Sequence, residues 1–352
     1  MKLLLVSPLQ ENTNGGIAVW TKIFVDAAKD AGIEPTVLNT AAVGKRLENG
    51  SAKRNFFDEV KRTRRIFRDL KALLKKETYD VAHINTSCGR FGIIRDYMTA
   101  KKIRRKQPNT RIIVHYNCDI PYQIRTKRSF KYLKKLLEVS DESMVLCDTS
   151  LEYLNERFGV VGTKVPNFID EKYIANESKA IRDVVEEILF VGRVSRAKGA
   201  LELFEVAKNF PSIRFSLIGS VDSKICTDNL PENISLLGQC DHDEVIEAMD
   251  RADLFFLPTH SEGFSLALLE AMARGLPAIT TDVGANADMM SGGCGAVVSV
   301  GDVSGMREKI ESFLSADSRS EASQIARCKV TNEYTMSKVV DIIKSCYSRG
   351  LG

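Results

Sequence analysis

The chain has 352 residues, of which 44% are hydrophobic and 27% charged, a balance typical of a globular protein with a sizeable core. This balance excludes disordered, collagen-like and low-complexity classes for most of the sequence, and the length favours two domains because single cores rarely grow beyond about 250–300 residues. The net charge of +4 hides a division, since residues 1–165 hold 31 Lys and Arg against 18 Asp and Glu, whereas residues 166–352 hold 19 against 28. The resulting charges of +13 and −9 predict a basic domain with an anionic partner, followed by an acidic domain.

Signals for export or membrane insertion are weak. Residues 1–8 contain only four consecutive apolar residues, too few for a signal peptide, and no later stretch approaches the ~18 apolar residues of a membrane span. The eight cysteines include no CxxC pair, which favours reduced thiols over disulfides or metal ligands. We therefore expect a cytoplasmic protein, or one bound peripherally to the inner face of the membrane.

Short apolar runs alternate with longer amphipathic segments along the chain. Strands are predicted at 3–7, 35–39, 81–85, 111–116, 144–147, 188–192, 213–218, 234–237, 254–257, 278–281 and 296–298. Helices are predicted at 17–31, 55–77, 90–107, 127–139, 199–209, 241–251, 265–274, 304–315 and 336–348. Strands that are apolar throughout are buried on both faces, as in parallel sheets covered by helices. Two such series predict an α/β protein with two doubly wound, Rossmann-like domains.

The domain boundary is expected in the turn-rich and polar stretch at 165–188. We assign residues 1–165 to an N-terminal domain and residues 166–335 to a C-terminal domain. The segment 336–352 follows the completed second series, and we expect it to pack back on the first domain.

Two turns after predicted strands are candidates for anion binding. Gly15 and Gly16 precede a helix, a position where backbone N–H groups can approach an anion, although a plain turn is the alternative because the dinucleotide and P-loop patterns are incomplete. Arg193 and Lys198 follow the strand at 188–192, at the edge where open α/β sheets bind ligands. A guanidinium and an ammonium there suit a diphosphate, and a solvated basic loop is the alternative.

The densest group of candidate residues spans 258–277. Ser265 is the expected N-cap of a helix that ends near Gly275. Glu270 lies on this otherwise apolar helix, where its carboxylate needs a partner such as a ribose diol. Glu262, in the preceding loop, is placed to accept hydrogen bonds from sugar hydroxyls. The backbone amides expected to face an anion belong to Gly263, Phe264, Ser265 and Leu266.

These motifs together resemble the retaining GT-B glycosyltransferases of family 4, also called glycosyl transferases group 1. Glu262 and Glu270 are similar to that family's E-x7-E motif, and residues 192–199 are similar to its G-R-x4-K-G sequence. The Gly15-Gly16 pair resembles its N-terminal glycine loop, and His115 ends a strand as a histidine does in the family. Where the family often has Asn-Gly after the first domain, this chain departs from the pattern with Phe168.

The resemblance implies a GT-B fold, with two Rossmann-like domains facing each other across a cleft. It implies that Arg193 and Lys198 bind the diphosphate of a nucleotide sugar, that Glu270 holds the ribose and that Glu262 contacts the donor sugar. It also implies that His115 contacts or positions the transferred sugar, whereas the residues alone favour a structural histidine. Transfer would retain the anomeric configuration, with front-face departure of the diphosphate and without a covalent nucleophile, cofactor or metal.

The segment Asp241-His242-Asp243 superficially matches the D-x-D metal motif of a different glycosyltransferase fold. Asp241 precedes a predicted helix, however, and Glu244 follows three residues later, as in a capping box. We therefore interpret the segment as structural.

The helix predicted at 55–77 carries eight Lys and Arg between residues 61 and 76 against a single acid, Asp69. Apolar residues recur on it at helical spacing, and a basic amphipathic helix suits adsorption to anionic lipid at roughly 1 kcal/mol per Lys or Arg. A core-facing helix with a solvated basic face is the alternative. A second basic cluster at 101–106 favours the membrane surface.

The leading hypothesis is a transferase that moves a sugar from a UDP-sugar, or next a GDP-sugar, to a lipid-linked saccharide in cell-surface polysaccharide synthesis. A sugar-nucleotide epimerase of the same fold is one alternative. A non-catalytic nucleic-acid-binding protein is another, but it lacks a recognisable module and leaves Glu262 and Glu270 unexplained, so we expect no nucleic-acid partner. A dehydrogenase is disfavoured because the full glycine fingerprint is missing.

Overall fold

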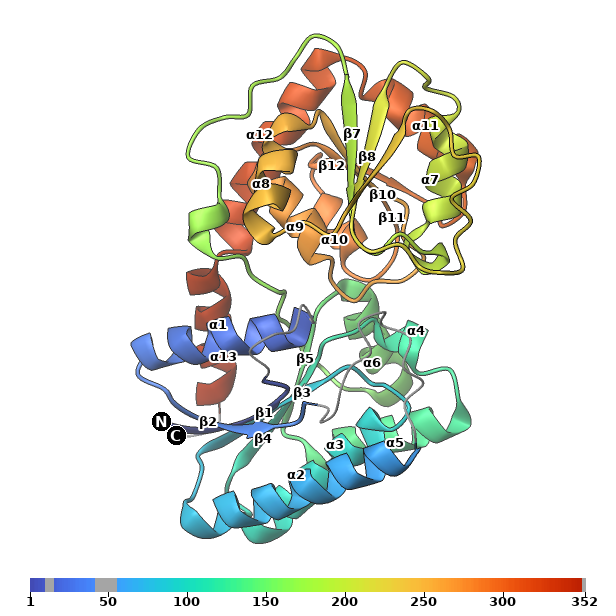
Figure 1. The fold of residues 1–352 in the computed structure, drawn as a ribbon. Helices are drawn as coiled ribbons and strands as arrows, with labels where there is room; N and C mark the ends of the chain where they lie inside the picture. Colours follow the sequence, from blue (N-terminus) through green and yellow to red (C-terminus); the bar gives the residue numbers. More distant parts are fainter. Residues whose placement is uncertain (10–15, 42–55, 350–352) are drawn as a thin grey trace. The chain divides into compact units, whose positions relative to one another are not determined.

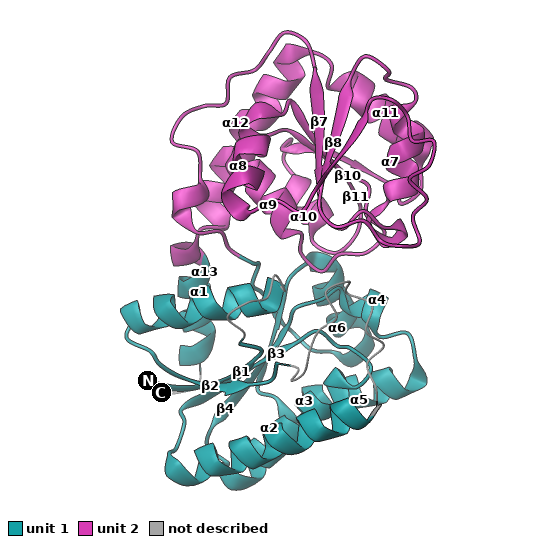
Figure 2. Cartoon of the chain, viewed as in Figure 1, with its two compact units in different colours: residues 1–167, 339–352 teal, residues 168–338 magenta. Residues whose placement is uncertain are grey.

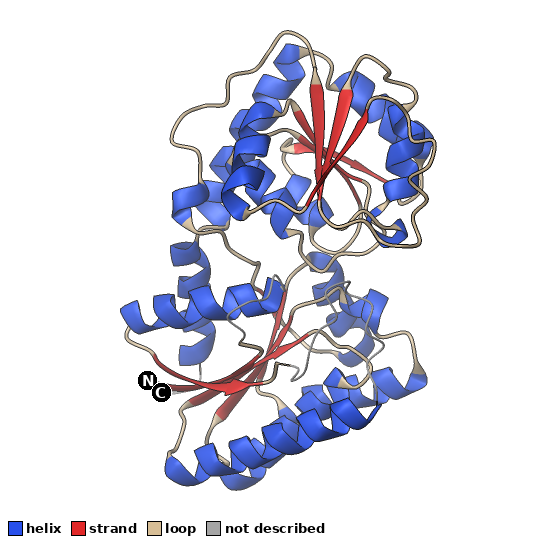
Figure 3. Cartoon of the chain, in the orientation of Figure 1, coloured by secondary structure: helices blue, strands red, loops and turns tan. Residues whose placement is uncertain are grey.

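The computed structural model describes residues 1–9, 16–41 and 56–349. The chain forms two compact units, residues 1–167 with 339–352 and residues 168–338 (Figure 2). Each unit contains a six-stranded parallel sheet with helices on both faces (Figure 3), so the expected α/β class with two doubly wound units is confirmed. Within the described ranges, no helix combines the length and the apolar composition of a membrane span.

The sheet of the first unit has the strand order β2-β1-β3-β4-β5-β6. Its inner strands are nearly all buried, and β3 is buried at each of its six positions, as expected for a parallel sheet covered on both sides. The strands are β1 (Lys2–Ser7), β2 (Glu34–Asn39), β3 (Val81–Thr86), β4 (Arg111–Tyr116), β5 (Glu142–Val145) and β6 (Thr163–Lys164).

Helices α1 and α13 cover one face of this sheet, and α2, α3 and α5 cover the other (Figure 1). The bounds are α1 (Gly16–Asp30), α2 (Phe56–Lys76), α3 (Gly92–Lys106), α4 (Ile120–Gln123), α5 (Lys127–Val139), α6 (Asp148–Phe158) and α13 (Met336–Ser348). The apolar side of α2 packs on the core through Ile66 and Leu70, which are fully buried. The apolar stripe of α2 therefore packs on the core of the first unit.

Helix α13 is joined to the first unit by a buried polar contact. Tyr347 and His83 are both fully buried, and the Tyr347 hydroxyl lies 2.6 Å from His83 Nδ1. The Arg111 guanidinium donates to the backbone carbonyl of Cys346. Residues 339–349 thus belong to the first unit although they follow the second in the sequence.

The sheet of the second unit has the strand order β12-β11-β10-β7-β8-β9. The chain runs outward from β7 to β9 and then returns to the other side of β7, so the strand order reverses between β7 and β10. The strands are β7 (Glu187–Val191), β8 (Arg214–Ile218), β9 (Ile234–Gly238), β10 (Leu254–Leu257), β11 (Ala278–Thr281) and β12 (Gly295–Val298).

Helices α8, α9 and α12 cover one face of the second sheet, and α7 and α11 cover the other (Figure 1). The bounds are η1 (Glu171–Tyr173), η2 (Arg196–Lys198), α7 (Ala200–Ala207), α8 (His242–Arg251), α9 (Leu266–Ala273), α10 (Asn286–Met290), α11 (Val303–Ser312) and α12 (Ala316–Glu333). Helix α12 is absent from the sequence prediction because its buried stripe consists mostly of small and polar residues, with Val330 as its one larger apolar side chain, and gives little apolar periodicity.

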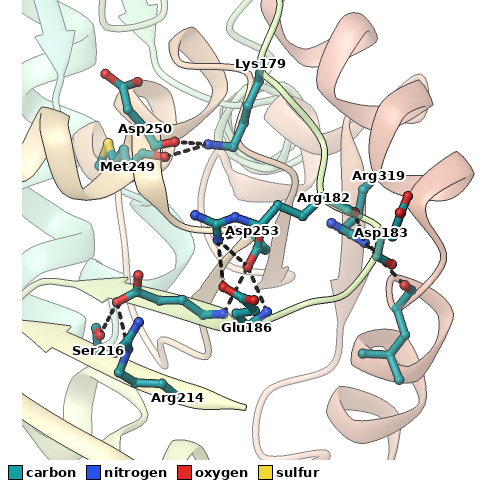
Figure 4. Close-up of polar contacts among 12 residues, drawn as sticks. Lys179, Arg182, Asp183, Glu186, Arg214, Ser216, Met249, Asp250, Asp253 and Arg319 are labelled. Carbon is teal, nitrogen blue, oxygen red and sulfur yellow. Dashed lines mark hydrogen bonds and ion pairs between the residues drawn. The ribbon is translucent and has the colours of Figure 1, made fainter. Parts of the chain in front are cut away.

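Charged side chains fasten the segment that leads into β7 to the second unit (Figure 4). The Lys179 ammonium donates to the carbonyls of Met249 and Asp250 at the end of α8, and its burial lowers the pKa of Lys179 to about 8. Asp253 accepts hydrogen bonds from the Arg182 guanidinium. The fully buried Arg319 donates to the carbonyl of Arg182, so α12 holds the same segment from the other side.

Candidate active site

The predicted cationic and acidic residues of the second unit lie at the point where its strand order reverses. Arg193 and Lys198 follow β7, and Glu262 follows the neighbouring parallel strand β10. In open α/β sheets, ligands bind outside the carboxyl ends of the strands at this reversal. The structure therefore brings together two motifs that are separated by about 60 residues in the sequence.

A glycine permits the close approach of these two loops. Gly199 has φ +74°, and a Cβ atom there would lie 1.8 Å from the carbonyl oxygen of Pro258. The His260 amide donates to the Ala197 carbonyl, at 3.0 Å, and its ring Nε2 lies 2.8 Å from the Glu202 carboxylate. The loop after β10 is thus fastened to the segment after β7 by backbone and side-chain contacts.

Lys198 and Glu262 form an ion pair across these loops. Their side chains retain 29% and 13% of their exposure, respectively, so the pair is partly screened from solvent. The ammonium has three donors, so it keeps donors for a second anion while it binds the carboxylate.

Arg193 lies on the other side of the same edge. Its Nε atom is 3.9 Å from the carboxylate of Asp222, which follows β8, and 39% of its side chain is exposed. The turn between β7 and Arg193 packs tightly against the end of β8, because a Cβ at Gly219 (φ +141°) would lie 2.0 Å from the Gly192 carbonyl. The backbone at Arg193 is therefore held in place, whereas its guanidinium group is accessible to solvent.

The N-terminus of α9 supplies backbone donors beside Glu262. Ser265 caps this helix, as predicted, with its hydroxyl accepting from the Leu268 amide at 3.2 Å. Gly263 and Leu266 flank the cap, and the buried Phe264 ring packs 5.9 Å from the ring of Tyr334. The loop after β11 packs against the backbone of Glu262, since a Cβ at Gly284 would lie 2.3 Å from the Glu262 carbonyl oxygen.

Glu270, on α9, finds its partner on α8. His242 Nε2 lies 3.0 Å from Glu270 Oε1, and this hydrogen bond raises the pKa of His242. His242 is the first residue of α8, and its neighbour Asp241 forms the predicted capping box with Glu244. The capping role of Asp241 is confirmed. Within the described parts of the chain, no group of three His, Cys, Asp or Glu side chains is arranged to hold a metal ion.

The structure places the remaining candidates in the first unit. His115 is fully buried, with Nε2 3.2 Å from the Val165 carbonyl and its ring against those of Trp20 and His83. Burial lowers its pKa to about 4 and keeps the ring neutral. His115 is thus packed inside the first unit, and its contact with a transferred sugar stays a prediction. Gly16 begins α1, whereas Gly15 lies outside the described residues.

Comparison with known proteins gives the same assignment as the motifs. Residues 173–329 match the family model for glycosyl transferases group 1. The match covers most of the second unit. The chain is 24% identical over 330 residues to the capsular polysaccharide biosynthesis glycosyltransferase CapM of Staphylococcus aureus, with 82% of this chain and 83% of the relative covered.

Two further proteins are similar over most of the chain. The UDP-Gal:alpha-D-GlcNAc-diphosphoundecaprenol alpha-1,3-galactosyltransferase of Escherichia coli is 26% identical over 313 residues, which cover 78% of this chain and 76% of the relative. The structure of sucrose-phosphate synthase from Thermosynechococcus elongatus superimposes with a TM-score of 0.79 at 18% identity, covering 98% of both chains. The chain therefore has the GT-B fold.

Sequence reasoning missed the partners of the candidate residues. Asp222 lies in a polar loop with no motif around it, and His242 was interpreted only as part of the structural segment 241–243 at a helix start. A signal for His242 existed, because Glu270 required a partner. The chain has only four histidines, and one of them, His242, lies at a helix start. Glu202 and His260 gave no signal, because their contact depends on the approach of two loops.

Proposed function

We propose that this glycosyltransferase transfers a sugar from a nucleoside-diphosphate sugar to a lipid-linked saccharide, with retention of anomeric configuration, in the synthesis of a cell-surface polysaccharide. The observation that carries the proposal is the grouping of Arg193, Lys198, Glu262 and the α9 N-terminus at one edge of the second sheet. The names of the two relatives support the acceptor class, and one of them supports UDP as the first donor nucleotide. GDP is kept as the second candidate from the motif resemblance.

The reaction needs positive charge where the diphosphate departs. Arg193 offers a planar donor for two oxygens, Lys198 a point charge, and the α9 N-terminus backbone amides with a favourable dipole. Such preorganised donors stabilise a leaving group without a metal ion, and we propose a metal-independent reaction on this ground. The acceptor would enter on the face from which the diphosphate leaves.

Donor binding would rearrange the Lys198–Glu262 ion pair. A diphosphate competes with Glu262 for the ammonium, and a carboxylate released from Lys198 is able to accept hydrogen bonds from donor-sugar hydroxyls. Occupation of the diphosphate site would thereby make the sugar-binding carboxylate available.

The donor assignment is tested by measuring sugar release. Purified protein is incubated with UDP- and GDP-sugars, and slow donor hydrolysis and transfer to undecaprenyl-diphosphate saccharides are quantified by chromatography. Hydrolysis of one donor class, lost in Arg193→Ala, supports the proposal. Epimerised nucleotide sugar without transfer to any acceptor would identify an epimerase instead.

We also propose that the basic face of the first unit adsorbs to the inner face of an anionic membrane. On α2, Arg62 and Arg65 donate to backbone carbonyls that follow β2, and the other six cations between residues 61 and 76 are exposed. The exposed cations of α2 and α3 are Lys61, Arg64, Arg68, Lys71, Lys75, Lys76, Lys101, Lys102, Arg105 and Lys106. Since the apolar stripe of α2 packs on the core, adsorption would be electrostatic rather than by insertion.

Vesicle binding tests this surface. Arg64→Glu, Arg68→Glu and Lys71→Glu together should release the protein from vesicles with 30% phosphatidylglycerol (roughly 1 kcal/mol for each removed cation). The matched control reverses three exposed cations of the second unit, Lys208, Lys224 and Arg307. Equal binding of both triple variants would overturn the membrane proposal and leave the donor site untouched.

A further inference from the structure

The contact between His242 and Glu270 has a defined direction. A carboxylate only accepts hydrogen bonds, so His242 Nε2 carries the proton and donates it to Glu270 Oε1 across 3.0 Å. The two side chains are 42% and 21% exposed, which places the contact at the surface of the unit. Glu270 Oε2 has no hydrogen-bond partner among the described residues.

The imidazole is held in position by its surroundings. The Tyr173 ring meets the His242 ring edge-to-face, with centroids 4.4 Å apart and an angle of 84°. Tyr173 is in turn fixed, because Arg274 donates to its backbone carbonyl at 3.1 Å and also binds Asp250 on α8. The orientation of the His242 ring is therefore set by contacts with Tyr173 and, through it, with Arg274 and Asp250.

This arrangement constrains a side chain that would otherwise rotate. A glutamate on a partly exposed helical position samples several rotamers, and fixing it costs free energy when a ligand binds. With Oε1 held by His242, the carboxylate plane is set and Oε2 is left as the acceptor. Glu270 is thus oriented before any ligand arrives.

We propose that His242 is a positioning residue for the ribose of the donor nucleotide, holding Glu270 so that its second oxygen accepts a hydrogen bond from a ribose hydroxyl. The inference rests on the proposed donor class, a nucleoside-diphosphate sugar. It assigns His242 to the selection of ribonucleotides over deoxyribonucleotides, because only a ribose hydroxyl satisfies an acceptor that is fixed in place.

Calorimetric titration with UDP, 2′-deoxy-UDP and 3′-deoxy-UDP, or the GDP series if GDP binds more tightly, tests the inference. We expect wild type to prefer the ribonucleotide about 10-fold over at least one deoxy analogue, the effect of about one charge-assisted hydrogen bond. His242→Ala should reduce this preference to about 3-fold or less by weakening the ribonucleotide alone. His242→Gln, which keeps an N–H donor, should restore part of it.

The controls separate this inference from the proposed function. Glu247→Ala, at an exposed position of the same helix, should leave the preference unchanged, and Glu270→Gln should lower it. A preference retained in His242→Ala but lost in Glu270→Gln would overturn the positioning role and leave the donor site intact. If wild type bound neither UDP nor GDP, the proposed function and this inference would both be overturned.

Discussion

Lys198 and Glu262 form an ion pair between the loops after two neighbouring strands of the second sheet. Both residues were expected to contact a donor, the first through the diphosphate and the second through the sugar. In this pair, the Glu262 carboxylate occupies the position expected for a diphosphate oxygen beside Lys198. The Lys198 ammonium likewise occupies the position expected for a sugar hydroxyl beside Glu262.

Removing the carboxylate should therefore strengthen the binding of a nucleotide that lacks the sugar. Glu262→Gln should raise the affinity for UDP or GDP by about 3- to 10-fold, because Lys198 no longer exchanges one anion for another. The same variant should lose most transfer activity. Calorimetry and a transfer assay measure the two effects, and weaker nucleotide binding in this variant would contradict the exchange.

The close approach at Gly199 predicts a sharp difference between two glycines with the same backbone angle. Gly199 and Gly32 have φ +74° and +75°, but only at Gly199 does a Cβ collide with backbone, 1.8 Å from the Pro258 carbonyl. Gly32→Ala should cost about 1–2 kcal/mol, the strain of a left-handed residue. Gly199→Ala should cost clearly more and abolish nucleotide binding. Equal losses of stability in denaturant titrations would argue against the contact.

Buried histidines predict a loss of stability in acid. Burial lowers the pKa of His83 well below 6.5 and that of His115 to about 4, so the unfolded chain takes up protons before the folded chain does. The free energy of unfolding should fall as the pH drops from about 6.5 towards 4, by about 3 kcal/mol for His115 alone. Unfolding followed at pH 7.5, 6 and 5 measures this. His115→Gln should flatten the dependence, and an unchanged slope in that variant would contradict it.

The contact of Tyr347 with His83 predicts that the last helix stabilises the first unit. Tyr347→Phe removes a buried 2.6 Å hydrogen bond and leaves His83 Nδ1 without its partner, at a cost of about 1–3 kcal/mol. Tyr153→Phe, at a half-buried site whose hydroxyl makes no hydrogen bond among the described residues, is the matched control. Similar losses in both variants would show that the hydroxyl of Tyr347 contributes nothing specific.

Most of the fold could be predicted because apolar periodicity and turn residues act locally. The strand at 111–116 and the cap at Ser265 were placed correctly from their neighbours alone. Strand β6 was missed because it has two residues, and α12 because its buried face includes Arg319 and Ser323. A burial pattern built from polar residues becomes visible only when their tertiary partners are known.

The candidate site was predictable in its parts but not in its contacts. The chemistry of Arg193, Lys198 and Glu262 followed from residue type and from their place after strands. That Lys198 pairs with Glu262, and that His242 holds Glu270, depends on loop approaches which no local pattern encodes. The burial of His115 was not predictable either, because a motif position in the sequence does not show which face of a strand the side chain occupies.

The central claim is that the edge between β7 and β10 binds a nucleoside diphosphate through Arg193 and Lys198. The most direct measurement is calorimetric titration of UDP and GDP into wild type and into the Arg193→Ala/Lys198→Ala variant, with Lys224→Ala as a control. We expect wild type and control to bind one nucleotide equally well and the double variant to bind it at least about 100-fold more weakly, while melting at a similar temperature. Undiminished binding by the folded double variant would contradict the account.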